Sequence, residues 1–177
     1  ENPEFDIMNV EDSTNITDIW IKEKLNDLVN HVRTEMKDYK LYNILDNLME
    51  FIDQFTNWYL KLNRDRLKGL DTLDNWQQSL KTTFDVLFKF SKVMAPFTPF
   101  FCEYLYSNLK CILKDERKSI HLFEYPEYET VKMPNIVRQM ERMQDVIEMI
   151  RRLRLDQSIN LSTPVKQVTI CHKDKQF

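Results

Sequence analysis

Four polar side chains in the middle of the chain have the types and spacing of a surface that binds nucleic acid. They are Asn57, Lys61, Arg64 and Lys68. Intervals of three or four residues place them within roughly 60° of one another on an α-helix. Lys and Arg neutralise phosphates, and Asn forms hydrogen bonds with the edges of unpaired bases. Trp58 lies at the border of this face, where it either stacks on a base or packs in the core.

Each of these residues also has a purely structural interpretation. Arg64 and Lys68 precede Gly69 at the expected end of the helix, where cations stabilise the negative end of the helix dipole. Arg66 lies on the packing side and is expected to pair with an acidic residue of a neighbouring helix. A second basic cluster, at the end of the last predicted helix, allows the same two interpretations, RNA contact or dipole stabilisation; it contains Arg151, Arg152 and Arg154.

The composition argues against catalysis and against a metal site. A single glycine excludes the Gly-rich loops that hold nucleotide phosphates. The three histidines have no serine or cysteine nucleophile placed beside them, and the three cysteines show no paired metal-ligand spacing. We therefore predict no catalytic residue, no metal ligand and no cofactor for these residues.

The net charge of −3 is unevenly distributed along the sequence. Residues 1–20 contain six Asp and Glu residues and no Lys or Arg, so the remainder has 25 basic residues against 28 − 6 = 22 acidic ones. Because charge acts over about a Debye length, roughly 8 Å at physiological salt, a local basic surface can still bind a polyanion.

One long helix, residues 41–69, is predicted to carry the polar face. Apolar residues recur along the opposite face at intervals of three and four, which indicates a side that packs in the core. This stripe consists of Leu41, Ile44, Leu45, Leu48, Phe51, Ile52, Phe55, Tyr59 and Leu62.

The same periodicity predicts three further long helices and a sharp corner. The first runs from about residue 17 to 38 with Asn15 or Thr17 as its cap, and the next begins at Asp74 or Asn75. In MAPFTPF, residues 94–100, a proline ends one helix and Thr98-Pro99 begins another, at a corner expected to be buried. A last helix is predicted over residues 134–155, and two alternating runs, residues 119–126 and 165–172, read as strands.

These elements predict a mainly α protein, an antiparallel helix bundle with a small C-terminal α+β fragment. We expect an acidic connector over residues 1–16, the helical domain over 17–155, and over 156–177 the start of a β-containing junction that is truncated. No run approaches the roughly twenty apolar residues of a membrane span. An odd cysteine count fits a reducing compartment, so we expect a cytoplasmic protein without a membrane partner.

Several motifs together resemble the anticodon-binding domain of class I isoleucyl-tRNA synthetases, most closely the eukaryotic cytoplasmic type. The order Asn57-Trp58-Tyr59, then the run from Asn63 to Gly69, is the specific part of the resemblance. MAPFTPF is shared more loosely with valyl and leucyl relatives. Further similar segments are YKLY, SIHLFEYP, RMQDVIEMIRRLR and TPVKQVTICHKD.

The resemblance implies binding of the anticodon stem-loop of isoleucine tRNA, through Asn57, Trp58, Lys61, Arg64, Lys68, Arg151 and Arg154. The family's nucleotide-binding signatures, His-Ile-Gly-His and Lys-Met-Ser-Lys-Ser, are missing. ATP use and charging are therefore expected of the remainder of the synthetase chain, and DNA is not an expected partner. The alternatives are a helical protein-interaction module within a synthetase assembly and the equivalent domain of a valyl or leucyl enzyme.

Overall fold

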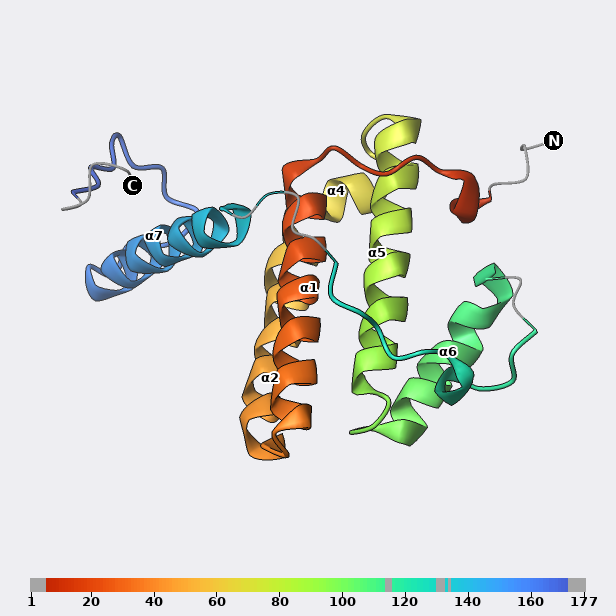
Figure 1. The fold of residues 1–177 in the computed structure, drawn as a ribbon. Coiled ribbons are helices and arrows are strands. Elements are labelled where there is room, and N and C mark those ends of the chain that lie inside the picture. Colours follow the sequence, from red (N-terminus) through yellow and green to blue (C-terminus); the bar gives the residue numbers. More distant parts are fainter. Residues whose placement is uncertain (1–5, 114–115, 130–132, 134, 172–177) are drawn as a thin grey trace. The chain divides into compact units, whose positions relative to one another are not determined.

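The computed structural model describes residues 6–113, 116–129, 133 and 135–171. It divides into two compact units, Glu1–Met133 and Pro134–Phe177. Both units are helical (Figure 1), and the described residues contain no β-strand. The predicted mainly α helix bundle is confirmed.

The first unit is built from four longer helices and several short turns. Its helices are α1 (Ile16–Lys37), α2 (Ile44–Asp53), α3 (Leu60–Leu62), α4 (Arg64–Leu67), α5 (Leu73–Met94) and α6 (Pro99–Leu113). A π-helical segment, η3 (Gln54–Tyr59), joins α2 to α3, and the 3-10 turns are η1 (Ile7–Asn9), η2 (Leu41–Asn43) and η4 (Ile120–Leu122).

Helix α5 is the central element of this unit. It packs against α1, α4 and α6 and against the turns η1 and η4 (Figure 1). Its first turn is capped by Thr72, whose hydroxyl accepts a hydrogen bond from the Asn75 amide, so neither predicted cap residue serves. In α1 the cap is Asn15, one of the two predicted, which accepts from the Thr17 amide at 2.9 Å. Side chains such as Phe84 and Val93 are buried along α5.

The continuous helix predicted over residues 41–69 does not exist, and α1 and α5, at 22 residues each, are the longest elements. The segment is divided by the π-helical turn η3 and by a break at Asn63, whose φ of −100° and ψ of 14° leave the helical region. Because a π-helical turn holds extra residues, it rotates the later side chains around the axis. Leu62, predicted inside, is 49% exposed, while Asn63 is buried.

The MAPFTPF corner is only partly buried, which corrects the prediction. Pro99 begins α6 as expected, and Met94 and Ala95 are buried. Phe100, however, is 90% exposed, because it follows the turn on the side that no other described element covers. The first two residues of the corner therefore contribute to the core, and Phe100 does not.

The two predicted strands are absent. Within residues 119–126 the chain forms the 3-10 turn η4, in which the Ser119 hydroxyl accepts from the His121 amide and the Glu103 carboxylate accepts from the Ile120 amide. Residues 165–171 form no regular secondary structure, and residue 172 lies outside the described part. A short alternating run has no intrinsic stability as a strand without a neighbour to pair with.

The second unit contains α7 (Ile136–Asp156), close to the predicted helix. The chain turns after it at Ser158, where φ is +54°. An Arg154 guanidinium nitrogen then donates to the carbonyl oxygens of Asn160 and Thr163, both at 2.8 Å. Arg154 therefore holds the segment that follows its own helix.

Candidate nucleic-acid interface

A row of three hydrogen-bonded polar side chains lies along the outer face of the first unit. Asn57 Nδ2 donates to Asp53 Oδ1 at 2.5 Å, and Lys61 Nζ donates to Asn57 Oδ1 at 2.8 Å. All three side chains are exposed. We call Asp53, Asn57 and Lys61 the outer row.

The outer row retains unused hydrogen-bonding capacity. The Asn57 amide has one further N–H and one further lone pair, and the Lys61 ammonium has two further N–H groups. A primary amide that presents a donor and an acceptor side by side can pair with a base edge, and the ammonium can neutralise a phosphate. The Asp53 carboxylate, which no pattern in the sequence analysis singled out, orients Asn57 and also adds a negative charge beside it.

Arg64, the first residue of α4, and Lys68, the residue that caps its C-terminus, lie beyond the break at Asn63 and form a second exposed pair. They are one turn apart, since the Lys68 amide donates to the Arg64 carbonyl at 3.1 Å. Within the described part of the chain, the Arg64 side chain makes no hydrogen bond or ion pair, so its guanidinium is available to a ligand. The four predicted residues thus occupy two adjacent short segments, two in each, and not one helix.

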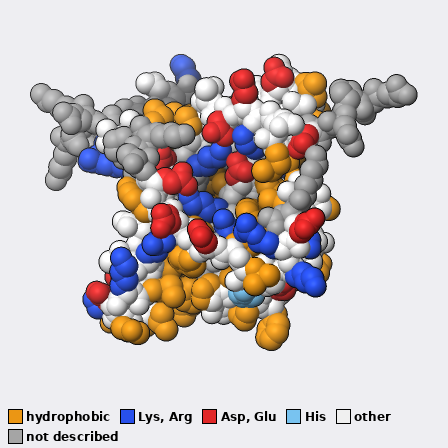
Figure 2. Space-filling view, turned by 45° about the vertical axis from the view of Figure 1, so that its right-hand side comes forward, with side chains coloured by type: hydrophobic (Ala, Val, Ile, Leu, Met, Phe, Trp, Pro, Cys, Tyr) orange, Lys and Arg blue, Asp and Glu red, His pale blue; other side chains and the backbone are white. Residues whose placement is uncertain are grey.

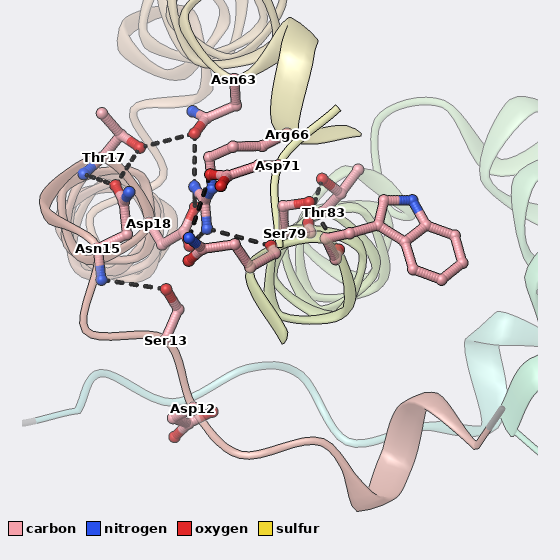
Figure 3. Close-up of polar contacts among 12 residues, drawn as sticks. Asp12, Ser13, Asn15, Thr17, Asp18, Asn63, Arg66, Asp71, Ser79 and Thr83 are labelled. Carbon is pink, nitrogen blue, oxygen red and sulfur yellow. Dashed lines mark hydrogen bonds and ion pairs between the residues drawn. The ribbon is translucent and has the colours of Figure 1, made fainter. Parts of the chain in front are cut away.

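The break that separates these pairs is fixed by the side chain of Asn63. Its Nδ2 donates to the Tyr59 carbonyl at 3.0 Å, which ties it to the preceding turn. Its Oδ1 accepts from the Thr17 hydroxyl at 3.0 Å and from Arg66 Nη1 at 2.5 Å. Figure 3 shows Asn63 and Arg66 pointing toward α1, where Thr17 lies. The direction of α4, and hence the placement of Arg64 and Lys68, is set by contacts with α1.

A buried ion pair lies directly below the break. Arg66 Nη2 is 2.9 Å from Asp18 Oδ2 and Arg66 Nη1 is 3.2 Å from Asp18 Oδ1, a two-pronged contact with a carboxylate that is 1% exposed (Figure 3). The expected pairing of Arg66 with an acidic neighbour is confirmed. Tyr59 Oη donates to Asp18 Oδ1 at 2.8 Å. We call Asp18, Tyr59, Asn63 and Arg66 the inner network.

The surroundings of Tyr59 in the inner network keep its hydroxyl protonated. Burial raises the pKa of Tyr59, and the negative charge of Asp18 raises it further, so the hydroxyl remains a donor. Arg66 Nη2 also reaches the Asn75 carbonyl of α5 at 3.5 Å. One arginine therefore connects α1, α4 and α5.

The remaining predicted site residues are placed differently. Trp58 is 8% exposed and packs in the core, the structural alternative given for it above. Arg151 and Arg154 belong to α7 in the second unit, where Arg154 is engaged by backbone carbonyls and Arg151 is exposed. These two are described with their own unit alone.

Sequence reasoning missed most of the inner network and one member of the outer row. The spacing of Asp53, Asn57 and Lys61 by four was a usable signal, because such side chains meet on a helical surface. Tyr59 was predicted to be buried, but nothing local marked Asp18 or its bonds to Tyr59 and Arg66, since these partners lie more than forty positions away in the chain.

The described residues contain no group of three His, Cys, Asp or Glu side chains placed to hold a metal ion. None of the helices in the described part combines the length and hydropathy needed to cross a membrane.

A helix bundle that exposes amide, ammonium and guanidinium groups in adjacent segments has the chemistry of an RNA-binding module. The family model for the anticodon-binding domain of tRNA ligase matches residues 18–170, and the chain belongs to that family.

The similar proteins are named as isoleucine–tRNA ligases. The chain is 40% identical over 165 residues to the cytoplasmic isoleucine–tRNA ligase of Arabidopsis thaliana, covering 93% of this chain and 14% of that protein. It is 36% identical over 174 residues to the Saccharomyces cerevisiae protein (93% and 16%) and 37% identical over 177 residues to the Mus musculus protein (94% and 14%). The resemblance stated from the motifs is confirmed, and the chain spans 14–16% of the length of these relatives.

Proposed function

We propose that this chain binds the anticodon stem-loop of isoleucine tRNA, as the anticodon-binding part of a cytoplasmic isoleucine–tRNA ligase. The observation that carries the proposal is the outer row beside the Arg64 and Lys68 pair, in a chain of the anticodon-binding family. Asn57 would pair with a base of the loop, and Lys61, Arg64 and Lys68 would neutralise phosphates near it. Lys61 is a point charge and lacks the planar fork of arginine, so the base-reading role falls to Asn57 or Arg64.

In this proposal the chain positions the tRNA and other parts of the ligase perform the chemistry. Amino-acid activation and ATP binding would then require residues outside this sequence. The chain alone should show no isoleucine-dependent pyrophosphate exchange, measured with a tag-only sample as the control. Exchange above that control would assign activity to these residues and contradict the proposal that other parts of the ligase perform the chemistry.

The direct test is binding of an isoleucine anticodon stem-loop at two salt concentrations. Phosphate contacts release counterions, so affinity should fall steeply as salt rises, with a log–log slope of about −0.7 for each single-strand phosphate neutralised. A stem-loop of the same stem with a different anticodon is the matched control, and it should bind more weakly if bases are read. Equal binding of both RNAs would overturn anticodon recognition.

A second candidate function, docking of another protein in a synthetase assembly, is favoured by exposed apolar side chains. On α6, Phe100 is 90% and Tyr104 68% exposed, and near α2, Tyr42 is 74% exposed. Figure 2 shows hydrophobic side chains gathered toward the lower edge of the face drawn, below a region of mixed Lys, Arg, Asp and Glu. Absence of RNA binding at low salt would favour this candidate.

A further inference from the structure

The hydroxyl of Thr17, in the first turn of α1, lies between two amide oxygens. Thr17 Oγ1 is 2.7 Å from Oδ1 of Asn15, the cap of α1, and 3.0 Å from Oδ1 of Asn63, at the break before α4. Figure 3 shows both contacts. One side chain therefore connects the start of α1 with the start of a helix that lies more than forty positions later in the chain.

Both neighbours present an acceptor atom to this hydroxyl. Asn15 Oδ1 also accepts from the Thr17 amide at 2.9 Å. Asn63 Oδ1 also accepts from Arg66 Nη1, while Asn63 Nδ2 donates to the Tyr59 carbonyl. A backbone N–H and a guanidinium can only donate, so these contacts fix which end of each asparagine amide is the oxygen.

A threonine hydroxyl carries one hydrogen, so Thr17 cannot donate fully to both oxygens at once. The distance to Asn15 is that of a complete O–H···O bond, and the distance to Asn63 is at the long end of the range. The hydrogen is therefore shared, and the larger share goes to the cap. A change that frees the hydroxyl from Asn15 makes it available to Asn63, whereas a change that removes the hydroxyl leaves Asn63 Oδ1 with Arg66 as its donor.

The conformation of Asn63 sets the direction in which α4 begins, because Arg64 follows it directly. Asn63 is 2% exposed, and its side-chain hydrogen bonds hold the φ of −100° and ψ of 14° that interrupt the helix. A wider range of conformations at Asn63 would spread the positions of Arg64 and Lys68. A ligand that binds one arrangement binds more weakly when that arrangement is less populated.

We propose that Thr17 is a positioning residue for RNA binding, because its shared hydroxyl hydrogen couples the cap of α1 to the direction of α4 and hence to Arg64 and Lys68. The proposal rests on the proposed function, since it assigns a residue that holds the same surface in its binding arrangement. The competing explanation is that Thr17 only completes the cap of α1. The two explanations differ in whether a change at Thr17 or at Asn15 weakens binding more.

The test compares unfolding temperatures and affinities for an isoleucine anticodon stem-loop among variants of the 177-residue chain, with binding measured by fluorescence anisotropy well below the unfolding temperature. Thr17→Val keeps the β-branch and removes the hydroxyl, and the oxygens of Asn15 and Asn63 each keep another donor. It should weaken binding about threefold, less than the roughly fivefold of a complete neutral hydrogen bond, because Arg66 still holds Asn63. Thr17→Ser keeps the hydroxyl and should restore most of the affinity.

Asn15→Ala distinguishes the two explanations. It removes the cap of α1 and should lower the unfolding temperature more than Thr17→Val does. It also frees the Thr17 hydroxyl for Asn63, so the affinity of the folded protein should fall less than in Thr17→Val. If Thr17 acts only through the cap, Asn15→Ala should weaken binding at least as much as Thr17→Val.

Thr34→Val is the matched control, because the Thr34 hydroxyl donates to the Asn30 carbonyl within α1. At 1.5 Å per residue Thr34 is about 25 Å along the helix from Thr17, so its loss should leave the affinity unchanged. The amide signals of α4 report on its conformation in NMR spectra recorded without RNA. They should shift in Thr17→Val and not in Thr34→Val.

The outcomes separate this inference from the proposed function. If Thr17→Val leaves the α4 signals and the affinity unchanged while Arg64→Ala weakens binding, Thr17 is not a positioning residue and anticodon recognition stands. If Asn15→Ala weakens binding at least as much as Thr17→Val, Thr17 acts through the cap and the inference is overturned. If Thr17→Val shifts the α4 signals but neither it nor Arg64→Ala changes the affinity, α4 is not the binding surface, and the positioning role falls together with the proposed site.

Discussion

The segment from Asp53 to Arg66 contributes to two polar clusters of similar composition and opposite surroundings, one of which is completed by Asp18 of α1. The outer row, Asp53, Asn57 and Lys61, is exposed, whereas the inner network of Asp18, Tyr59, Asn63 and Arg66 is almost entirely buried. Both contain one carboxylate, one asparagine amide and one cation. The inner network adds the Tyr59 hydroxyl, and its cation is an arginine that binds its carboxylate through two nitrogens.

The difference in burial gives the two clusters different roles, one structural and one in binding. In the interior a hydrogen bond is electrostatically strong and a broken one leaves a costly unpaired charge, so the inner network fixes geometry. At the surface the same contacts contribute little stability and exchange readily with a ligand. The inner network orients α4, and the outer row with Arg64 and Lys68 remains available for binding.

The largest expected effect is loss of the buried ion pair. Arg66→Ala leaves the Asp18 carboxylate, which is 1% exposed, with no cation beside it, and should reduce the free energy of unfolding by about 3–5 kcal/mol in urea titrations. Lys68→Ala, which removes an exposed cation two positions away, should change it by less than about 0.5 kcal/mol. A loss below about 1 kcal/mol for Arg66→Ala would mean that the inner network does not stabilise the fold more than the exposed side chains do.

The next effect concerns binding. Arg64 is exposed and lies beyond the break, so Arg64→Ala should leave the unfolding free energy within about 0.5 kcal/mol. It should weaken binding of the isoleucine anticodon stem-loop by about 1–3 kcal/mol. A smaller salt slope would indicate a phosphate contact, and an unchanged slope with relaxed base preference a base contact.

Arg64→Lys serves as the control for geometry, because it keeps the charge and loses the fork. If Arg64→Ala binds the stem-loop as well as the parent at low and moderate salt, the surface beyond the break is not the binding surface.

A smaller effect is expected from the titration of Tyr59. Its pKa is raised in the folded state, so the folded protein keeps a proton that the unfolded chain loses above a pH of about 10. This stabilisation is complete below that pH and decreases as pH rises. Between pH 9 and pH 11 the parent should lose about 1.4 kcal/mol more unfolding free energy than Tyr59→Phe.

Chemical denaturation at several pH values measures this difference. The pKa of Tyr125, raised by burial to about 12, contributes in both proteins and cancels. Parallel stability curves for the parent and Tyr59→Phe would show that water reaches the inner network.

The sequence predicted the elements that depend on local signals. The helices α1, α5, α6 and α7 were found to within a few residues, because apolar spacing, caps such as Asn15 and the Thr98-Pro99 start act over one or two turns. The π-helical segment and the break at Asn63 were missed. The break at Asn63 is held by a hydrogen bond from Thr17, and Arg66 just after it is held by Asp18; no local pattern specifies these partners on α1.

The candidate site was also predicted only in part. The sequence predicted which polar residues lie on the surface, and Asn57, Lys61, Arg64 and Lys68 are all exposed. The sequence did not predict how these residues are arranged, because a continuous helix was assumed where the chain has two segments. Phe100 was placed inside for a similar reason, as its exposure depends on which elements cover the corner.

The smallest expected effect tests whether the outer row is tuned for binding. Asp53→Asn removes a negative charge next to Asn57 and Lys61 while keeping an oxygen that can accept from Asn57. An exposed pair contributes little, so the unfolding free energy should change by less than about 0.5 kcal/mol. At about 8 Å in water a unit charge repels a phosphate by about 0.5 kcal/mol, so the stem-loop should bind about twofold more tightly at low salt.

That gain should disappear at high salt, because screening removes the repulsion that Asp53→Asn relieves. Asp53→Ala is the control, since it removes the repulsive charge and also the oxygen that holds Asn57. If orientation of Asn57 by Asp53 matters, Asp53→Ala should bind more weakly than Asp53→Asn at both salt concentrations. If both variants bind the stem-loop more weakly than the parent does at low salt, the Asp53 carboxylate itself contacts the RNA as an acceptor for a base amino group. All three side chains of the outer row would then take part in base recognition.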